Sequence, residues 1–403
     1  TIALVVMGML GSAYPISGGT YVYGARFFSR VASFTGVWAY VLGAILGLFP
    51  LFALTGATFL KALFPALPKI PVALALLFIF YVTNLLGTKL ATWVQAILVA
   101  ILLSALVLFL GRGMPQIEWS QFQPLFPGGI GGFAVAASIL TFTILGSNAA
   151  LELGDEIINP ERNIPRSFLI SIPVVTTLYV LIALVAAGGR AGLAAAQAAA
   201  AARTAAAAGA EVSAVPLSDI AADFLQGFPF AYFIVGGGVL AVITTLNATY
   251  LWGTKSLIMI TEDGLFPAAL ARVNKRFGTP HWFLTLIFLG SVAALLIAGD
   301  RVETLAVFAS IGGIIIFVPV MGAALRLRSV APEIYERSRL KLKGGFYYLA
   351  PIVGLLLSVV IIVILLVDLS SHEHGFLFLA FFALWTVAGA FYAWRRCGSS
   401  PCP

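Results

Sequence analysis

The sequence predicts an all-α polytopic membrane protein, on the strength of three observations. Hydrophobic residues make up 61% of the 403 residues, whereas charged residues make up only 10%. A soluble domain carries roughly a quarter charged residues. Mean hydropathy is +1.04. Apolar runs of about 20 residues, long enough to cross a bilayer as a helix, recur along the whole chain.

Eleven of these apolar runs are predicted to span the membrane as helices, because each is bounded by charged or turn-forming residues and is too long for a single strand. The predicted spans are 2–24, 31–60, 70–86, 90–111, 131–154, 166–187, 228–259, 281–298, 303–325, 346–368 and 375–394.

The loops between these spans predict the orientation of the chain. When the sides alternate, seventeen of the 23 Lys and Arg residues fall on one side and six on the other. Loops rich in Lys and Arg are retained on the cytoplasmic side of a membrane. The side with seventeen basic residues, which includes the C-terminus, is therefore expected to face the cytoplasm, and the membrane is expected to be the plasma (inner) membrane. The first span then begins outside without a signal peptide, and we therefore expect that another helix precedes Thr1.

One span carries an interruption at its middle. Residues 133–166 read FAVAASILTFTILGSNAALELGDEIINPERNIPR, and Gly146, Ser147 and Asn148 follow one another inside the apolar part. Glycine destabilises a helix interior, and Ser and Asn compete for its backbone hydrogen bonds. Broken backbone at membrane depth is tolerated only where it is buried in protein or lines a cavity. The stretch 143–148 is therefore a candidate binding site, unless Gly146 only allows close helix packing.

Two of the connecting segments are distinctive in composition. Residues 188–227 form an Ala-rich segment on the predicted extracellular side, which could cover an outward-facing cavity or act as an exposed linker. Residues 326–345 form a basic loop on the predicted cytoplasmic side, where anionic lipid would attract it.

The sequence gives no support to an enzyme, a metal site or a nucleic-acid-binding protein. It contains no nucleophile elbow, phosphate-binding loop or zinc-protease helix. Its three histidines lie at loop edges, and Cys397 and Cys402 lie together in the tail. The net charge of +7 is distributed over loops. A transporter, a channel and a membrane receptor remain, and a channel is disfavoured because the spans show no repeated polar face.

Three motifs resemble those of amino acid permeases. Residues 15–23, PISGGTYVY, are similar to the P-x-S-G-G-x-Y-V-Y signature of that family. Residues 156–166, EIINPERNIPR, are similar to the family's E-x-x-N-P-x-R-x-I-P-R loop, ten residues after Gly146. Residues 245–248 together with 262–267, EDGLFP, resemble a third block. The chain is thus identified as a member of the amino acid–polyamine–organocation superfamily.

This resemblance implies a single transporter domain over residues 1–403 with a LeuT-like fold. Such a fold contains two inverted five-helix repeats followed by two further helices, twelve in all. Residues 1–111 would be the remainder of the first repeat, residues 131–325 the second repeat, and residues 346–394 the two extra helices. The family's first helix, whose glycine-rich break binds the substrate carboxylate, would be absent.

The resemblance also implies roles for residues at the interrupted span. Carbonyl groups before Gly146 would accept hydrogen bonds from the substrate ammonium group, and Phe142 would lie over the pocket as a gate. Asn148 stands where the family often has Glu, as in the subgroup that transports large neutral amino acids. The implied substrate-binding residues are Phe142, Thr143, Ile144, Leu145, Gly146 and Asn148.

The charge of the spans predicts the class of substrate. Residues 31–60, 131–151 and 228–254 contain no charged side chain, and intramembrane charges usually face a transport pathway. We therefore expect alternating-access transport of neutral or apolar amino acids. A permease for cationic amino acids, amines or polyamines remains an alternative, since Phe142 could bind a cation through its ring. A receptor that binds without translocating is the alternative from another class.

Two positions in the spans bear on the coupling ion. Adjacent Thr244 and Thr245 resemble the hydroxyl pair of Na⁺ sites in related transporters, although threonine often bonds back to its own helix. Proton-coupled members often carry a lysine in the fourth predicted span, and Leu102 occupies that position, so either Na⁺ or H⁺ remains open. The sequence assigns no accessory subunit.

A cytoplasmic gate is predicted from the charges that follow the interrupted span. Glu156 with Arg162 or Arg166 is expected to form an ion pair that closes the inner side. The alternative is that these charges are solvated and contribute under about 1 kcal/mol.

Overall fold

The computed structural model describes residues 2–87, 92–123, 126, 129–189, 216–370 and 375–397, and within these ranges it is all-helical apart from one isolated β-bridge. Eight helical runs there are long and apolar enough to cross a membrane. They are Arg30–Leu63, Val94–Gln116, Gly129–Glu152, Pro160–Gly188, Phe228–Glu262, His281–Ala298, Val302–Val330 and Phe346–Ser370.

The helices follow one another with short connections. In chain order they are α1 (Ile2–Ala13), α2 (Gly19–Phe27), α3 (Arg30–Tyr40), η1 (Val41–Ile45), α4 (Leu46–Leu63), α5 (Lys69–Leu85), α6 (Thr92–Gly113), η2 (Met114–Gln116), η3 (Trp119–Phe122), α7 (Gly129–Ile139), η4 (Leu140–Ile144), α8 (Ala149–Glu152), η5 (Gly154–Glu156), α9 (Pro160–Gly188), α11 (Leu217–Ala222), α12 (Phe228–Tyr232), η6 (Phe233–Val239), α13 (Leu240–Gly253), α14 (Lys255–Glu262), α15 (His281–Ala298), α16 (Val302–Ile315), α17 (Phe317–Val330), α18 (Pro332–Arg337), α19 (Phe346–Ser370) and α20 (Gly375–Cys397).

Each predicted span falls on helix in the residues described, but the first one needs correction. The segment 2–24 consists of two helices, α1 and α2, with non-helical backbone at Tyr14–Gly18 between them. Pro15 has no N–H to continue the helical hydrogen bonding, and Gly18 adopts a φ of 65°. The predicted total of eleven spans stays a prediction, because α1 and α5 are shorter than a span of ordinary length.

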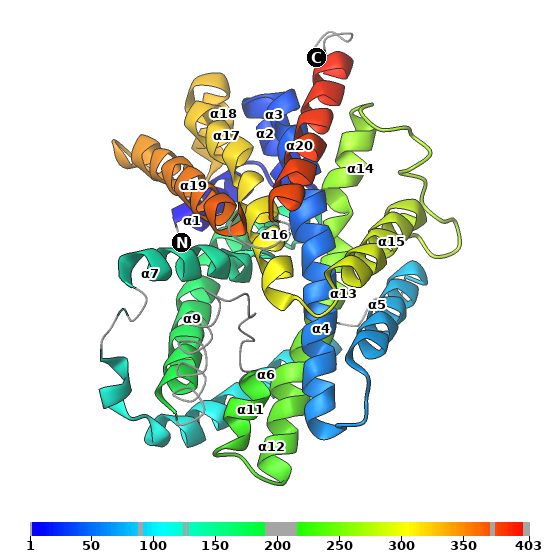
Figure 1. Ribbon diagram of the computed structural model, residues 1–403. Coiled ribbons are helices and arrows are strands. Elements are labelled where there is room, and N and C mark those ends of the chain that lie inside the picture. Colours follow the sequence, from blue (N-terminus) through cyan, green and yellow to red (C-terminus); the bar gives the residue numbers. More distant parts are fainter. Residues whose placement is uncertain are drawn as a thin grey trace.

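The long run formed by α3, η1 and α4 crosses the molecule and contacts α2, α5, α13, α15, α16, α17 and α20, whereas α7 and α9 lie away from it (Figure 1). The main buried core is formed by side chains from α1–α5, α8, α9 and α13–α20. A smaller apolar core joins α6, α9, α11 and η6. Close approach at the centre depends on Gly43 of η1, where an added Cβ would lie 2.6 Å from the Cα of Gly312 on α16.

The structure describes the basic segment 326–345 and part of the Ala-rich segment 188–227, both of which are predicted as loops. The basic segment 326–345 is partly helical, because α17 continues to Val330 and α18 follows. It packs on α1 through the Ser338 hydroxyl, which donates to the Met9 carbonyl at 3.0 Å. In the Ala-rich segment 188–227, residues 190–215 lie outside the described ranges.

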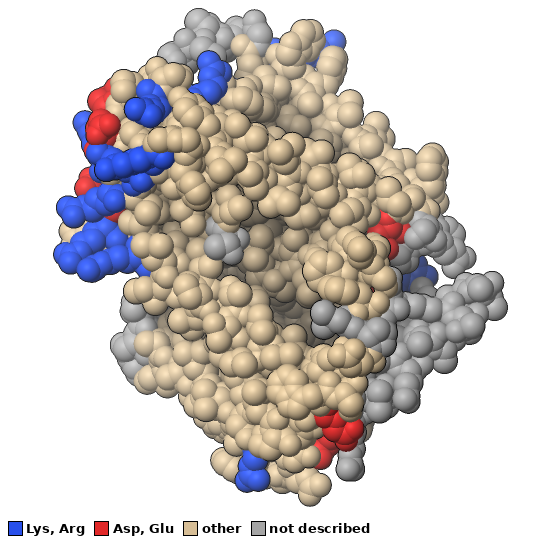
Figure 2. All heavy atoms as spheres, turned by 90° about the vertical axis from the view of Figure 1, so that its left-hand side faces the viewer, with Lys and Arg blue, Asp and Glu red and all other residues tan. Residues whose placement is uncertain are grey.

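Charge is unevenly distributed over the surface. Figure 2 shows Lys and Arg side chains gathered at one end of the molecule, while most of the middle of the same face carries neither sign. Exposed large apolar side chains are frequent on α9, α15, α19 and α20. This is the pattern of a protein whose middle faces lipid.

The last helix, α20, is joined to α3 by a pair of tryptophans. The rings of Trp38 and Trp385 are stacked, with centroids 4.3 Å apart and planes 6° apart. Each indole N–H donates to the backbone carbonyl of the other residue at 2.9 Å. Gly389 leaves room for this pair, because an added Cβ would lie 2.1 Å from the Trp38 ring.

Candidate functional site

The helix that begins at α7 breaks at the position that the sequence predicts. α7 ends at Ile139 and tightens into the 3₁₀ segment η4, after which Leu145 is extended with a ψ of 142°. Gly146 has a φ of 95°, a conformation that other residues rarely adopt. An added Cβ on Gly146 would meet nothing within 4 Å. The backbone conformation rather than close packing therefore requires glycine here.

Polar side chains satisfy part of the backbone that the break exposes. The Gly146 N–H donates to Asn148 Oδ1 at 3.2 Å, and the Ser147 hydroxyl donates to the Ile144 carbonyl at 2.6 Å. From α9, the Tyr179 hydroxyl donates to the Thr143 carbonyl at 3.3 Å. Asn148 is buried, and its Nδ2 has no hydrogen-bond partner among the described residues. Ser and Asn therefore act as local caps of the break.

Helix α16 holds both sides of the break in place. The Ser310 hydroxyl donates to the Ile139 carbonyl at 2.7 Å, at the end of α7. An added Cβ on Gly313 would lie 2.1 Å from Cδ2 of Leu145. The Leu145 side chain thus occupies the space that Gly313 leaves on α16. These contacts fix the extended residue against a helix that is buried along most of its length.

A cavity of about 280 Å³ opens beside the break, between α4, α6 and α13. It brings Leu145 and Gly146 together with Thr244 and Thr245, four residues that the sequence singles out in two separate segments. None of the described residues that line it carries a charge. They are Leu48, Phe52, Gln95, Leu145, Gly146, Ala149, Thr244, Thr245, Ala248, Thr249 and Trp252.

Four of the residues implied as substrate-binding do not line this cavity. Phe142 is half-buried and packs against the main core, as does Ile144. Thr143 uses its hydroxyl to bond the Leu140 carbonyl at 2.7 Å. Asn148 is buried, and its Oδ1 accepts from the Gly146 N–H. Their substrate roles stay predictions, and the cavity itself supports only Leu145 and Gly146 among the six.

The threonine pair bonds back to its own helix. Thr244 Oγ1 lies 2.9 Å from the Leu240 carbonyl and 3.0 Å from the Ala241 carbonyl, and Thr245 Oγ1 donates to the Ala241 carbonyl at 2.7 Å. This is the arrangement expected if the two threonines only bond back to their own helix, which is the alternative to an ion site. Each hydroxyl oxygen keeps lone pairs that could face the cavity, so a Na⁺ site here stays a prediction.

The predicted gate has a different partner. Glu156 forms an ion pair with Lys255, the first residue of α14, and not with Arg162 or Arg166 in the part of the chain that the structure describes. Asn159 turns the chain with a φ of 49° before α9 begins. Both arginines therefore lie on α9, beyond this turn, where they are exposed. The ion pair in this structure is thus Glu156–Lys255, and a gate formed by Glu156 with Arg162 or Arg166 stays a prediction.

Charged residues at the same end of the molecule form a second contact. Arg30, at the start of α3, lies 3.6 Å from Asp263, which follows α14. The Tyr21 hydroxyl donates to the same carboxylate at 2.6 Å. Arg162 instead lines a separate pocket with Arg339.

The segment PISGGTYVY packs against the end of the broken helix. Ser17 and Leu153 form an isolated antiparallel bridge, and the Gly18 N–H donates to the Glu152 carbonyl at 3.0 Å. An added Cβ on Gly154 would lie 2.6 Å from the backbone N and O of Ile16. Gly154 therefore allows the end of the broken helix to lie directly against the backbone of this motif.

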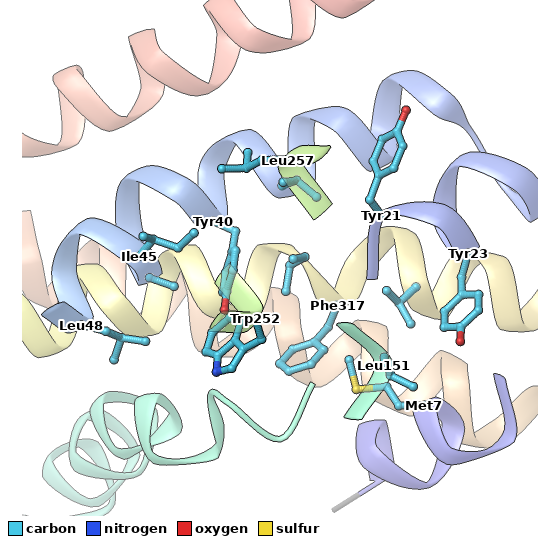
Figure 3. Packing of buried hydrophobic residues seen from close by; sticks show 14 of the residues in the cluster. Met7, Tyr21, Tyr23, Tyr40, Ile45, Leu48, Leu151, Trp252, Leu257 and Phe317 are labelled. Carbon is cyan, nitrogen blue, oxygen red and sulfur yellow. The ribbon is translucent and has the colours of Figure 1, made fainter. Parts of the chain in front are cut away.

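Sequence reasoning missed several residues of this region. Gln95 and Trp252 line the cavity, and Tyr40 packs against Trp252 with ring centroids 6.2 Å apart (Figure 3). Glu152 is buried at 2% exposure beside Ser256. A signal for Glu152 was present, since it is the one charged residue of the predicted span 131–154.

Comparison with known proteins identifies relatives along nearly the whole chain. The family described as "Amino acid permease" matches residues 1–391. The branched-chain amino acid permease of Bacillus subtilis (strain 168) is 26% identical over 293 residues, covering 72% of this chain and 55% of the relative. The chain thus spans about half the length of that relative.

Two further relatives carry other names. The methylthioribose transporter of Bacillus subtilis is 25% identical over 343 residues, covering 80% of this chain and 70% of the relative. The Asc-type amino acid transporter 1 of Homo sapiens is 26% identical over 361 residues, covering 84% of this chain and 64% of the relative.

A solved structure shares the fold. The crystal structure of an Eremococcus coleocola manganese transporter aligns with a TM-score of 0.52 and 14% sequence identity, covering 98% of this chain and 84% of that one. At this identity the likeness concerns the fold alone.

Proposed function

The chain belongs to the amino acid permease family, and from that premise we propose that it is a secondary active transporter of neutral or apolar amino acids. It is an integral, multi-pass membrane protein, and its family and relatives are transporters rather than enzymes. The proposed membrane is the plasma (inner) membrane, with the basic end of the molecule in the cytoplasm. The proposed mechanism is alternating access.

The observation that carries the proposal is the cavity beside Gly146. Its volume of about 280 Å³ is close to the lower limit of small-molecule sites, about 300 Å³, which suits a single amino acid. Its walls combine apolar side chains with threonine hydroxyls, amide and backbone groups. Extended Leu145 contributes a carbonyl outside the regular helical ladder, and we propose that it accepts a hydrogen bond from the substrate ammonium group.

The absence of charge among the described lining residues favours a neutral side chain on the substrate. A cationic or anionic side chain would be desolvated without a partner there, at a cost that a neutral one avoids. The relatives do not decide the substrate, because one is named for branched-chain amino acids and another for methylthioribose.

Transport can be tested with the purified protein in proteoliposomes. Labelled L-leucine, L-alanine, L-arginine and putrescine would be offered separately, and both uptake and binding measured. We expect uptake of leucine or alanine in preference to the two cations. Preferred uptake of arginine or putrescine would favour the cationic alternative, and binding without uptake would favour a receptor.

A cavity-filling variant tests where the substrate binds. Ala248→Leu adds volume inside the cavity, so we expect leucine uptake to fall about tenfold or more while alanine uptake is retained. Ala183→Leu makes the same chemical change on an exposed position of α9 and serves as the matched control. Equal effects of the two variants on leucine uptake would place the substrate elsewhere.

A further inference from the structure

Glu152 is a carboxylate buried inside the broken helix. It is the last residue of α8, six positions after Gly146, and only 2% exposed. Both carboxylate oxygens lie within hydrogen-bond distance of one hydroxyl, that of Ser256 on α14, at 2.9 and 2.8 Å. One hydroxyl can donate only one hydrogen at a time, so Ser256 Oγ satisfies one carboxylate oxygen at most, and the backbone N–H groups of Ser256 and Thr20 face the carboxylate as further donors.

Other buried polar atoms near Glu152 lack partners. Thr20 Oγ1 of α2 lies beside the carboxylate but makes no hydrogen bond of good geometry. The Tyr40 hydroxyl of α3 and Asn148 Nδ2 are buried near one another, and neither makes a hydrogen bond of good geometry within the described residues. Figure 3 shows Tyr40 extending from α3 toward Trp252. Unpaired buried polar groups are rare and call for a physical explanation.

No cation faces Glu152 from the described elements that pack around it. α1 has no titratable side chain, α2 carries Tyr21, Tyr23 and Arg26, and α13 carries Tyr250. The cations of this region have other partners. Arg26 donates to the Tyr14 hydroxyl at 2.6 Å, Arg30 pairs with Asp263, and Lys255 pairs with Glu156, while Glu262 adds only a further acid on α14.

An ionised carboxylate in this setting would be a buried charge without a counter-ion, which is costly within a membrane. A neutral carboxylic acid avoids that cost and gains an O–H donor. Glu152 does not line the 280 Å³ cavity, and Na⁺ would need several oxygen ligands, whereas a proton needs no space.

We propose that Glu152 is a proton-binding site, protonated in this conformation and deprotonated when water reaches the inner half of α8. The route for water follows from the contacts that cover it. The Ser17–Leu153 bridge and the Glu156–Lys255 ion pair lie immediately beyond Glu152, so separating them exposes the carboxyl group. Resting on the proposed transport function, this inference names H⁺ as the coupling ion.

Infrared difference spectroscopy tests the protonation without any substrate. The full chain in lipid would be titrated while the carbonyl stretching band of protonated carboxylic acids is recorded. We expect a titrating band that is absent from Glu152→Gln and present in Glu303→Gln, a matched change at an exposed residue. A band unchanged by Glu152→Gln would overturn the proposal.

A second variant covers the case in which Glu152→Gln does not fold. Ser256→Ala keeps the carboxyl group and removes the hydroxyl that bonds it, so we expect the band to move to higher frequency. An unshifted band would mean that the titrating acid is not Glu152.

Proton flux in proteoliposomes tests the coupling. With one proton per substrate, a gradient of one pH unit can drive at most about tenfold accumulation. We expect this accumulation in the native protein and none in Glu152→Gln, with substrate exchange retained. Accumulation by Glu152→Gln equal to that of the native protein, or driven by Na⁺ alone, would overturn the coupling role. If the native protein moves no amino acid, the proposed function fails, while the infrared result still decides the protonation of Glu152.

Discussion

The chain breaks its helices at Tyr14–Gly18 and again at Leu145–Asn148, and each break contains a glycine with positive φ, but the surroundings of the glycines differ. At the first break, glycine permits contact, since an added Cβ on Gly19 would lie 2.7 Å from the Leu151 carbonyl oxygen. At the second, an added Cβ on Gly146 would meet nothing, and the φ of 95° is what requires glycine. One break is packed against protein, and the other lies beside a cavity.

The two breaks are also in contact with each other, because residues 16–19 lie against residues 151–154. The packed break therefore holds the α8 end of the broken helix, whose other side lies beside the cavity. A change at the packed break should reduce the amount of folded protein, whereas a change at the open break should reduce transport. Four sets of variants can test this difference between folding and transport, and they are ordered from the largest expected effect to the smallest.

Gly154→Ala should be the most damaging change. Its Cβ would lie 2.6 Å from backbone atoms of Ile16, and backbone cannot move aside as a side chain can. We expect a loss of about 3 kcal/mol of stability, measured as a fall in melting temperature and in monodisperse yield. The control is Gly345→Ala, where an added Cβ meets nothing. Equal stability of the two variants would refute the packed character of this break.

Gly146→Leu should remove transport and leave most of the protein folded. Holding a leucine at this φ costs about 1–3 kcal/mol, and the chain can relieve that strain by closing the break. Initial uptake rates and size-exclusion profiles measure the two effects. Gly146→Asn is the matched control, because asparagine tolerates positive φ better, and it should retain more uptake. Full uptake by the leucine variant would be incompatible with a functional break.

Asn148→Ala should weaken substrate affinity moderately. The variant loses the Oδ1 acceptor of the Gly146 N–H, a bond worth about 1 kcal/mol, so we expect the half-saturating concentration to rise about fivefold. Ser147→Ala, which removes a donor to the Ile144 carbonyl, should have a smaller effect. An affinity for substrate that is unchanged in Asn148→Ala would show that this cap does not shape the cavity.

Exchanging the charges of Glu156 and Lys255 should have the smallest effect. Their side chains are 48% and 23% exposed, so the pair contributes under about 1 kcal/mol. Each single reversal should slow uptake slightly, and the double reversal should restore it. Reversing Glu156 together with Arg162 serves as the control. Restoration by that control instead would return the gate to the partner that the sequence predicts.

The sequence was sufficient for the helical class and for the open break. Apolar length identifies the spans, and the run of Gly146, Ser147 and Asn148 marks the break because all three residues disfavour a helix interior. The apolar pattern does not mark the packed break, since apolar and aromatic residues continue across it and the segment 2–24 looks like one span.

Partners across the fold could not be read from local sequence. Glu156 and Lys255 are 99 positions apart, whereas the arginines that were predicted lie within ten positions of Glu156. The burial of Glu152 depends on how α2 and α14 pack around α8, and the place of Gln95 in the cavity depends on the rotation of α6. These are properties of tertiary packing, which residue spacing within one segment does not encode.

The stacked pair of Trp38 and Trp385 has a consequence for observing the protein at work. Two indoles 4.3 Å apart and nearly parallel couple their electronic transitions, so their near-ultraviolet circular dichroism depends on the distance between α3 and α20. The protein thus carries an intrinsic optical reporter of whether its last helix follows the central one. A spectrum that changes when substrate is added would record that the two helices separate, and Trp385→Phe would identify the signal.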